Sequence, residues 1–152
     1  MEGCSAPFHV CAVAGKGMGC IASRQVDVGE RVLCESPLFS MGPTEYKHGV
    51  ATAVKGGAER GRVWGRSSMS VRERVDALSP GQKAIFFGLS QNEERFGSAK
   101  TPEGIWATNA LPCHCFSQGY SGIFPLAARM NHSCAPNVAF HWSPALGALT
   151  IH

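Results

Sequence analysis

Short apolar runs separated by glycine and proline dominate the N-terminal part of the chain. Residues 8–14, 20–23 and 31–35 are such runs, and their length and composition are typical of strands. The glycine-rich segment 15–19 is expected to turn, because glycine adopts backbone conformations that other residues avoid. Pro37 bars a continuing central strand. This region therefore predicts three short strands.

Two segments in the middle of the chain have helical spacing. Val71, Val75 and Leu78 fall at i, i+4 and i+7 on one helical face. Residues 70–73 have the Ser-x-x-Glu form of a capping box, which marks the start of this helix. The pair at 79–80, Ser-Pro, can cap and start a second helix with proline at its first position. We therefore expect two consecutive helices here.

The remaining segments predict more strands than helices. Residues 104–111, 137–142 and 148–152 have the composition of strands, and 125–130 that of one helical turn. The stretch 41–68 is rich in glycine and arginine and nearly without periodicity, so it is expected to be an insert or a loop. The hydrophobic pattern thus predicts a mainly β chain whose helices are confined to an insert.

The composition supports a folded domain and argues against several classes of protein. A length of 152 residues fits one domain, and 44% hydrophobic against 16% charged residues is too apolar for a disordered tail. The formal charge of +3 is weak for a nucleic-acid binder. Arg60, Arg62 and Arg66 are better explained by a solvated loop than by a phosphate-binding strip. We therefore expect no direct nucleic-acid binding.

Cysteine usage indicates a reducing compartment. The chain has 7 cysteines, an odd number, and the apolar run at 10–14 is too short for a signal peptide. No stretch approaches the roughly 20 apolar residues that span a bilayer. We therefore expect a nuclear or cytoplasmic protein without membrane contact. Its cysteines are expected to be thiols or metal ligands rather than disulfides.

The segment Asn131-His132-Ser133-Cys134-Ala135-Pro136-Asn137 carries the most specific chemistry. Its Asn-His-Ser triplet is a glycosylation signal only in a secreted protein, which the N-terminus argues against. His132 and Cys134 could begin a zinc site, although alternate residues of a strand point to opposite faces. The plainest interpretation is a polar turn between a short helix and a strand.

Other blocks around this heptad give it a more specific meaning. They are Gly15–Ala22, Val28–Leu33, Glu35–Leu38, Thr108–Ala110 and Gly122–Pro125. In this order they resemble the SET domain of protein lysine methyltransferases, over roughly residues 8–39 and 104–152. The resemblance is strongest to SMYD-like and fungal stand-alone SET proteins, in which an insert splits the domain. A MYND-type finger is excluded, because no cysteine lies between Cys34 and Cys113.

The resemblance implies a SET-type β-clip fold of small antiparallel sheets. Its three parts would be an N-terminal SET part at 8–39, an insert of loop and two helices at 40–103, and a C-terminal SET part at 104–152. In the family the sequence continues past His152 to the catalytic tyrosine. The chain is therefore interpreted as a fragment that is incomplete at its C-terminus, and no catalytic residue is assigned within it.

The resemblance also implies S-adenosyl-L-methionine as the cofactor. The positions that match its binding residues are Lys16, Gly17, Met18, Asn109, Asn131 and His132. Glycine lets backbone approach a ligand closely, a lysine ammonium suits the cofactor's carboxylate, and an asparagine amide both donates and accepts. Lys16 could equally be an exposed turn residue, and the asparagines could stabilise turns. His132 matches through its backbone.

The substrate and metal positions depart from the family pattern. Leu111 stands where members often have an aromatic residue, and Trp106 and Phe116 are the other candidates for an apolar lysine channel. Cys134 matches a cysteine that joins three later ones around a zinc ion. Those later cysteines are not in this sequence, so zinc is expected only in a longer protein.

These matches predict an S-adenosylmethionine-dependent protein lysine N-methyltransferase. Its partner would be a histone or another protein with a target lysine, and the activity of this fragment is left open. A catalytically dead SET-like interaction module is the alternative. A third interpretation is a small zinc module of Cys113, Cys115, Cys134 and His132, although the Cys-x-Cys spacing favours ordinary loop cysteines.

Overall fold

The computed structural model describes residues 6–42, 69–113 and 119–152. The chain divides into two compact units, of which unit 1 comprises Met1–Leu38 with Phe124–His152 and unit 2 comprises Phe39–Ile123. The three-part division expected from the sequence stays a prediction. Most of the loop predicted at 41–68 lies outside the described residues.

A two-stranded hairpin belongs to unit 1. Strand β1 (Phe8–Val13) pairs antiparallel with β2 (Gly17–Ala22), and Val13 lies opposite Gly17 beside the turn. Gly15 and Gly17 have φ angles of 70° and 69°, which residues with a Cβ rarely adopt. The predicted turn and its two flanking strands are confirmed, with β2 beginning earlier than expected, at Gly17.

Three further strands of unit 1 form an antiparallel sheet in the order β3–β8–β7. Their bounds are Leu33–Glu35 for β3, Phe140–Ser143 for β7 and Ala148–Ile151 for β8. Every residue of the central strand β8 is buried, and Trp142 packs edge-on against Phe124 with ring centroids 6.3 Å apart. The turn predicted at 125–130 is the 3-10 helix η2 (Ala127–Arg129).

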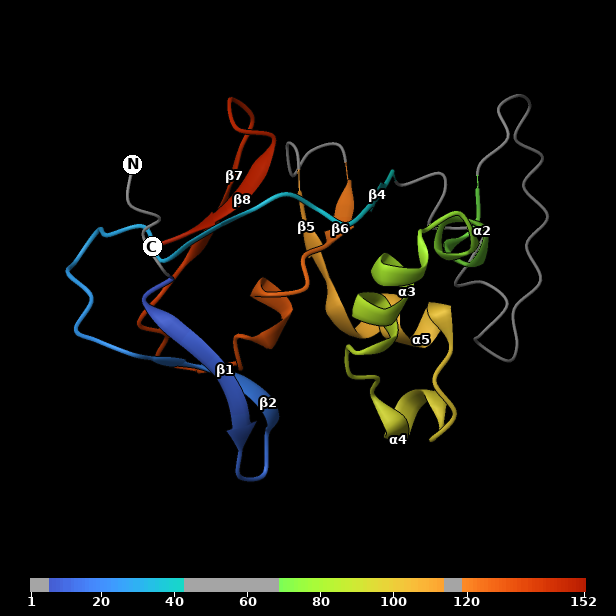
Figure 1. Ribbon diagram of the computed structural model, residues 1–152, viewed down its shortest axis with the longest axis horizontal. Coiled ribbons are helices and arrows are strands. Elements are labelled where there is room, and N and C mark those ends of the chain that lie inside the picture. The colour runs from blue at the N-terminus through green and yellow to red at the C-terminus, as the bar shows by residue number, and fades with distance from the viewer. Residues whose placement is uncertain (1–5, 43–68, 114–118) are drawn as a thin grey trace. The chain divides into compact units, whose positions relative to one another are not determined.

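Unit 2 combines a small sheet with four short helices among its described residues (Figure 1). The antiparallel sheet has the order β4–β6–β5, with β4 at Ser40–Met41, β5 at Ala110–Pro112 and β6 at Ser121–Ile123. The helices are α2 (Val71–Asp76), α3 (Pro80–Phe87), α4 (Glu93–Phe96) and α5 (Pro102–Asn109). Phe86 and Trp106 are fully buried, and both rings contact Phe39.

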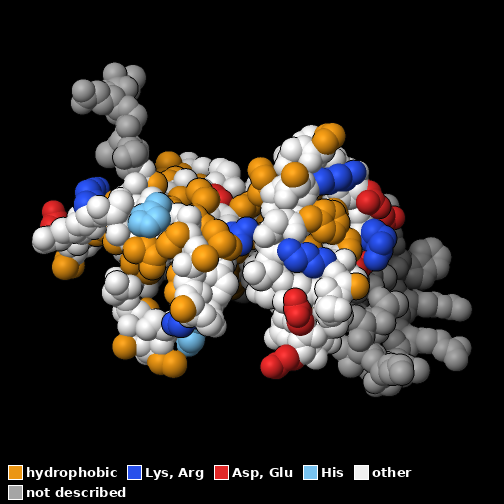
Figure 2. All heavy atoms as spheres, turned by 60° about the horizontal axis from the view of Figure 1, so that its bottom comes forward, with side chains coloured by type: hydrophobic (Ala, Val, Ile, Leu, Met, Phe, Trp, Pro, Cys, Tyr) orange, Lys and Arg blue, Asp and Glu red, His pale blue; other side chains and the backbone are white. Residues whose placement is uncertain are grey.

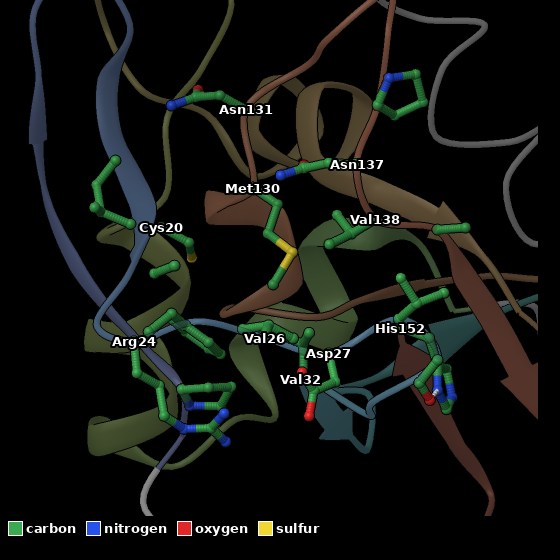
Figure 3. Close-up of a pocket in the computed structure, with 18 of the residues that line it drawn as sticks. Cys20, Arg24, Val26, Asp27, Val32, Met130, Asn131, Asn137, Val138 and His152 are labelled. Carbon is green, nitrogen blue, oxygen red and sulfur yellow. Dashed lines mark hydrogen bonds between the residues drawn. The ribbon is translucent and has the colours of Figure 1, made fainter.

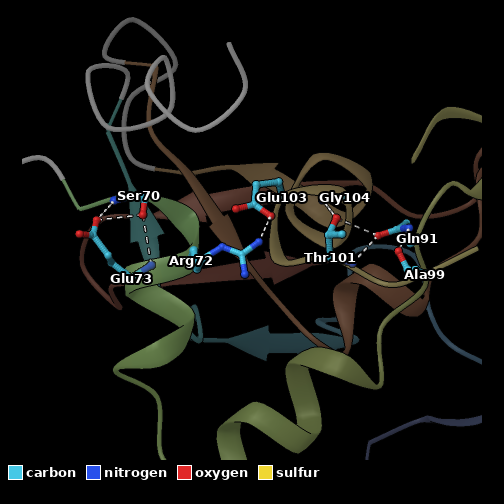
Figure 4. Close-up of polar contacts among 8 residues, drawn as sticks. All are labelled: Ser70, Arg72, Glu73, Gln91, Ala99, Thr101, Glu103 and Gly104. Carbon is cyan, nitrogen blue, oxygen red and sulfur yellow. Dashed lines mark hydrogen bonds and ion pairs between the residues drawn. The ribbon is translucent and has the colours of Figure 1, made fainter. Parts of the chain in front are cut away.

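Both predicted helices begin where their sequence signals place them. The Ser70 hydroxyl accepts a hydrogen bond from the Glu73 amide at 3.2 Å, and the Glu73 carboxylate accepts one from the Ser70 amide at 2.6 Å (Figure 4). Ser79 and Gln82 form the same reciprocal pair at the start of α3. Each box satisfies backbone donors that a helix leaves unpaired, so the predicted caps are confirmed.

The strand predicted at 104–111 is wrong for most of its length. Residues up to Asn109 belong to helix α5, and only Ala110–Pro112 form a strand. A β-branched residue next to an aromatic one favours a strand when considered locally. In the folded chain Ile105 and Trp106 are instead fully buried on a helix.

The start of α5 explains why the helix forms. The Thr101 hydroxyl accepts a hydrogen bond from the Gly104 amide at 3.0 Å, and Pro102 takes the first helical position. The side-chain oxygen of Gln91 accepts from the Thr101 amide at 2.8 Å (Figure 4). A Cβ on Gly104 would overlap this same oxygen. The cap signal at 101–102 was therefore present in the sequence, but Gln91 adds a contact that sequence spacing does not reveal.

Small antiparallel sheets with short helices confirm the predicted fold class, mainly β with a helical insert. The expectation that the helices are confined to the insert around residues 70–90 is wrong. Helix α4 was not predicted, and α5 continues to Asn109. Within the described parts of the chain, no helix has the length and apolar character needed to cross a membrane.

Candidate functional site

A cavity of about 840 Å³ lies in unit 1. Its walls come from the β1–β2 hairpin, the loop that follows β2, and the segment from Met130 to Ala139 (Figure 3). The sheet β3–β8–β7 and the hairpin bring these segments together although they lie far apart in the sequence. The cavity is therefore a product of tertiary folding within one unit.

Lys16 and Asn131 both line this cavity. Gly19 lies directly against the asparagine, because a Cβ added to Gly19 would overlap the Asn131 amide nitrogen and lie 2.8 Å from Cγ2 of Val13. Lys16 and Asn131 are both exposed residues. The cavity thus has one basic and one amide group from two separate sequence motifs, and both are accessible to a ligand.

Apolar side chains form another part of the cavity wall. Met130 and Val138 lie beside each other, with the Met130 thioether directed into the cavity between Cys20 and Val138 (Figure 3). Val26 and Val32 come from the loop that follows β2. No sequence pattern indicated that these apolar residues would line a cavity. Only for Met130 could its position next to Asn131 have indicated a place in the cavity wall.

The loop after β2 is held by a salt bridge. Two guanidinium nitrogens of Arg24 contact the two carboxylate oxygens of Glu30 at 3.1 and 2.5 Å, and the Asp27 amide donates to the same carboxylate. The hydrogen bonds from Arg24 and Asp27 lower the pKa of Glu30. His152 Nδ1 lies 3.2 Å from the Gly29 carbonyl oxygen, which links the loop to the segment after β8. Arg24, Asp27, Gly29 and His152 all line the cavity.

The other hairpin residues expected at a cofactor site lie differently. Gly17 begins β2 with positive φ, and Met18 follows it with 42% of its surface exposed. Both are described by the structure, and neither is among the residues that line the cavity. Their contact with a cofactor stays a prediction.

His132 and Cys134 are exposed, and their Nε2 and Sγ atoms lie 3.4 Å apart. Within the described ranges, no group of three or more His, Cys, Asp or Glu side chains could hold a metal ion. Cys113 is buried, and this burial raises the pKa of its thiol to about 11. Cys115 lies outside the described residues. The zinc module of Cys113, Cys115, Cys134 and His132 therefore has no support from the residues that the structure describes.

The remaining predicted site residues belong to unit 2. Asn109 is buried, and its amide nitrogen donates to the carbonyl oxygens of Ser90 and Ile105, both at 2.7 Å. These two bonds use both hydrogens of the amide. Asn109 therefore fastens α5 to the segment after α3, and its contact with a cofactor stays a prediction.

The two described candidates for a lysine channel are also part of unit 2. Trp106 is fully buried and stacks on Phe39, with ring centroids 5.3 Å apart. Leu111 is half-buried in β5. Phe116 lies outside the described residues. Both described side chains provide apolar packing, and their role in a channel stays a prediction.

The charges of the described residues are mixed on the face shown in Figure 2. Lys and Arg side chains and Asp and Glu side chains are both scattered over that face, and no large area of one sign is seen on it. A protein that neutralises several phosphates would need such an area. This face therefore gives no support for nucleic-acid binding.

No family model matches the chain. The chain is similar to histone-lysine N-methyltransferase set5 of Schizosaccharomyces pombe, with 28% identity over 149 residues. The similarity covers 95% of this chain but only 37% of that protein, so the chain spans about a third of the length of this relative.

Proposed function

We infer that the chain belongs to the SET-domain methyltransferase family, and we propose that it is an S-adenosylmethionine-dependent protein lysine methyltransferase. The family assignment rests on the similarity to set5 along nearly the whole chain and on the heptad at 131–137. The cofactor, the substrate and the activity are the proposed part.

One observation carries the cofactor proposal: Lys16 and Asn131 line the same cavity, and Gly19 packs against the Asn131 amide. These residues come from the two sequence motifs that resemble the cofactor-binding segments of the family. The cavity volume of about 840 Å³ lies within the range of about 300–1,000 Å³ that is usual for small-molecule sites.

The side chains in the cavity fit the chemistry of the cofactor. The Lys16 ammonium can pair with a carboxylate, and the Asn131 amide can accept from an ammonium or donate to a carboxylate. Met130 and Val138 offer apolar surface for an aromatic ring. When bound, S-adenosylmethionine supplies a methyl group on a positively charged sulfur.

The protein must also make the substrate amine reactive. A free lysine has a pKa of about 10.4 and is charged at neutral pH. An apolar channel lowers that pKa, because desolvation disfavours the charged ammonium. We propose that apolar side chains form the wall of such a channel, for which Leu111 and Trp106 are the residues predicted from the sequence. The rest of catalysis is alignment of the amine with the methyl group.

The substrate is proposed to be a histone or another protein with an accessible lysine, by extension from the name of set5. A nuclear or cytoplasmic location is proposed with it. Cys134 is proposed as a zinc ligand only in a longer protein that supplies three further ligands.

Isothermal titration calorimetry of the full chain with S-adenosylmethionine tests the proposal. We expect saturable binding that weakens roughly 10- to 100-fold in Asn131→Ala, because hydrogen bonds to charged groups contribute about 1.5–3 kcal/mol. Lys16→Ala should also weaken binding, whereas Lys83→Ala, which removes a charge from α3 in unit 2, should not. Wild-type affinity in Asn131→Ala would contradict the proposal.

Methyl transfer separates the enzyme from an interaction module. Radiolabelled S-adenosylmethionine is supplied to the chain with mixed histones and with a mixture of other soluble proteins. Labelled lysine in a substrate supports the methyltransferase. Cofactor binding without transfer to any of these proteins would favour a catalytically dead module.

A further inference from the structure

Glu35, at the end of β3, reaches a turn that lies far away in the sequence. Its Oε1 atom accepts a hydrogen bond from the Leu126 amide and its Oε2 atom one from the Ala127 amide, both at 2.9 Å. These bonds join residues that are 91 and 92 positions apart. Both carboxylate oxygens are thus used by consecutive backbone donors.

These two amides are the donors that η2 itself leaves unpaired. The next three amides bond inside the turn: Ala128 to Phe124, Arg129 to Leu126 and Met130 to Ala127, at 2.8, 2.9 and 3.0 Å. The turn has no side-chain cap of its own. A carboxylate at this end also has the charge that a helical turn favours. Glu35 therefore completes the hydrogen bonding of η2 from a strand of the sheet.

The turn leads directly into the cavity. Met130 closes η2 through its own amide, and Met130 and Asn131 then both line the cavity. The Leu126 carbonyl also lies 3.8 Å from the Cys20 sulfur on β2. Contacts with Glu35 of β3 and Cys20 of β2 thus hold η2, the turn that the chain leaves through Met130 and Asn131.

We propose that Glu35 is a positioning residue for the methyl-donor site, holding η2 so that Asn131 meets Gly19 and the cavity. This inference rests on the function proposed above. It explains why a carboxylate is needed at 35: glutamine offers one oxygen, and its amide group would face a second N–H donor. Burial raises the pKa of Glu35, against the two backbone hydrogen bonds that lower it. The carboxylate thus lies in a partly desolvated place, where these two hydrogen bonds support its charge.

The test compares Glu35→Gln with Glu103→Gln, which removes a carboxylate that pairs with Arg72 at 3.3 Å in unit 2. Amide and side-chain resonances are recorded by nuclear magnetic resonance in the ligand-free protein, and affinity for S-adenosylmethionine by calorimetry. In Glu35→Gln we expect the amides of Leu126 and Ala127 and the side-chain amide of Asn131 to shift. Affinity should fall about tenfold, the size expected for losing a charged hydrogen bond. Glu103→Gln should change none of these.

The outcomes separate this inference from the proposed function. If the wild-type chain does not bind S-adenosylmethionine, the function fails, while the ligand-free spectra still report whether Glu35 positions Asn131. Wild-type affinity and an unshifted Asn131 resonance in a folded Glu35→Gln variant would overturn the inference. If that variant does not fold, hydrogen exchange in the wild-type chain decides. Slow exchange at Leu126 and Ala127 supports the contact, and exchange as fast as in exposed loops overturns it.

Discussion

Gly19 leaves the space that the side-chain amide of Asn131 occupies. A Cβ on this glycine would overlap that amide nitrogen and approach Val13 to 2.8 Å. The contact joins the glycine-rich hairpin to the Asn-His-Ser motif, which are separated by more than half the chain. The identity of residue 19 is therefore linked to the position of residue 131.

Gly19→Ala should weaken S-adenosylmethionine binding about tenfold or more. The added methyl group must displace Asn131 or Val13, and overpacking of this kind costs about 1–3 kcal/mol. Calorimetry measures the affinity. Gly81→Ala is the matched control, because no atom lies within 4 Å of its added Cβ and it lies on helix α3. The control should bind normally and unfold at the same or a higher temperature. Equal affinities in both variants would contradict the contact.

Asn109→Ala should destabilise the protein by about 1–3 kcal/mol, because it removes the two hydrogen bonds that this buried side chain donates to the carbonyl oxygens of Ser90 and Ile105. Urea denaturation followed by tryptophan fluorescence measures the loss. Asn131→Ala is the comparison, since Asn131 is exposed and its removal should change stability little while lowering cofactor affinity. Wild-type stability in Asn109→Ala would rule out the structural role described for this residue.

Ser70→Ala should reduce the free energy of unfolding by about 1 kcal/mol. The change removes the hydroxyl that accepts from the Glu73 amide and so uncaps α2. Thermal unfolding of Ser98→Ala, an exposed position in a bend, supplies the control. Identical melting temperatures for Ser70→Ala and Ser98→Ala would show that the cap is not formed in solution.

Cys113 should resist alkylation in the native protein. Its thiol is buried and has a pKa of about 11, so at pH 8 almost none of it is the reactive thiolate. Iodoacetamide at that pH should label the exposed Cys34 and Cys134 first, as peptide mass spectrometry can show. Labelling of Cys113 should follow only after unfolding. Native labelling as fast as at Cys34 would contradict its burial.

Glu35 should make stability depend on pH in the acidic range. Its pKa in the folded protein is raised above 4.5, mainly by burial, so the folded state holds its proton more tightly than the unfolded state. Its contribution to stability is therefore full below pH 4.5 and is lost as pH rises through the folded pKa. Melting temperatures between pH 4.5 and 7 should show this trend in the wild type relative to Glu35→Gln. A constant difference across that range would refute the shift.

The sequence by itself determined the local elements. The capping boxes at Ser70 and Ser79 and the glycine turn at 15–17 were predictable because their signals lie within a few residues of the atoms they bond. The Asn-His-Ser-Cys motif predicted a SET-type domain for a different reason, since its residue types in that order are specific.

Tertiary structure decided the rest. Local preference favoured a strand around Ile105 and Trp106, but burial of both side chains and the contact of Gln91 with Thr101 favour the helix. The bonds from Leu126 and Ala127 to Glu35 could not be predicted either. Hydrophobic periodicity records which face of an element is buried, whereas such contacts depend on which elements become neighbours when the sheet forms.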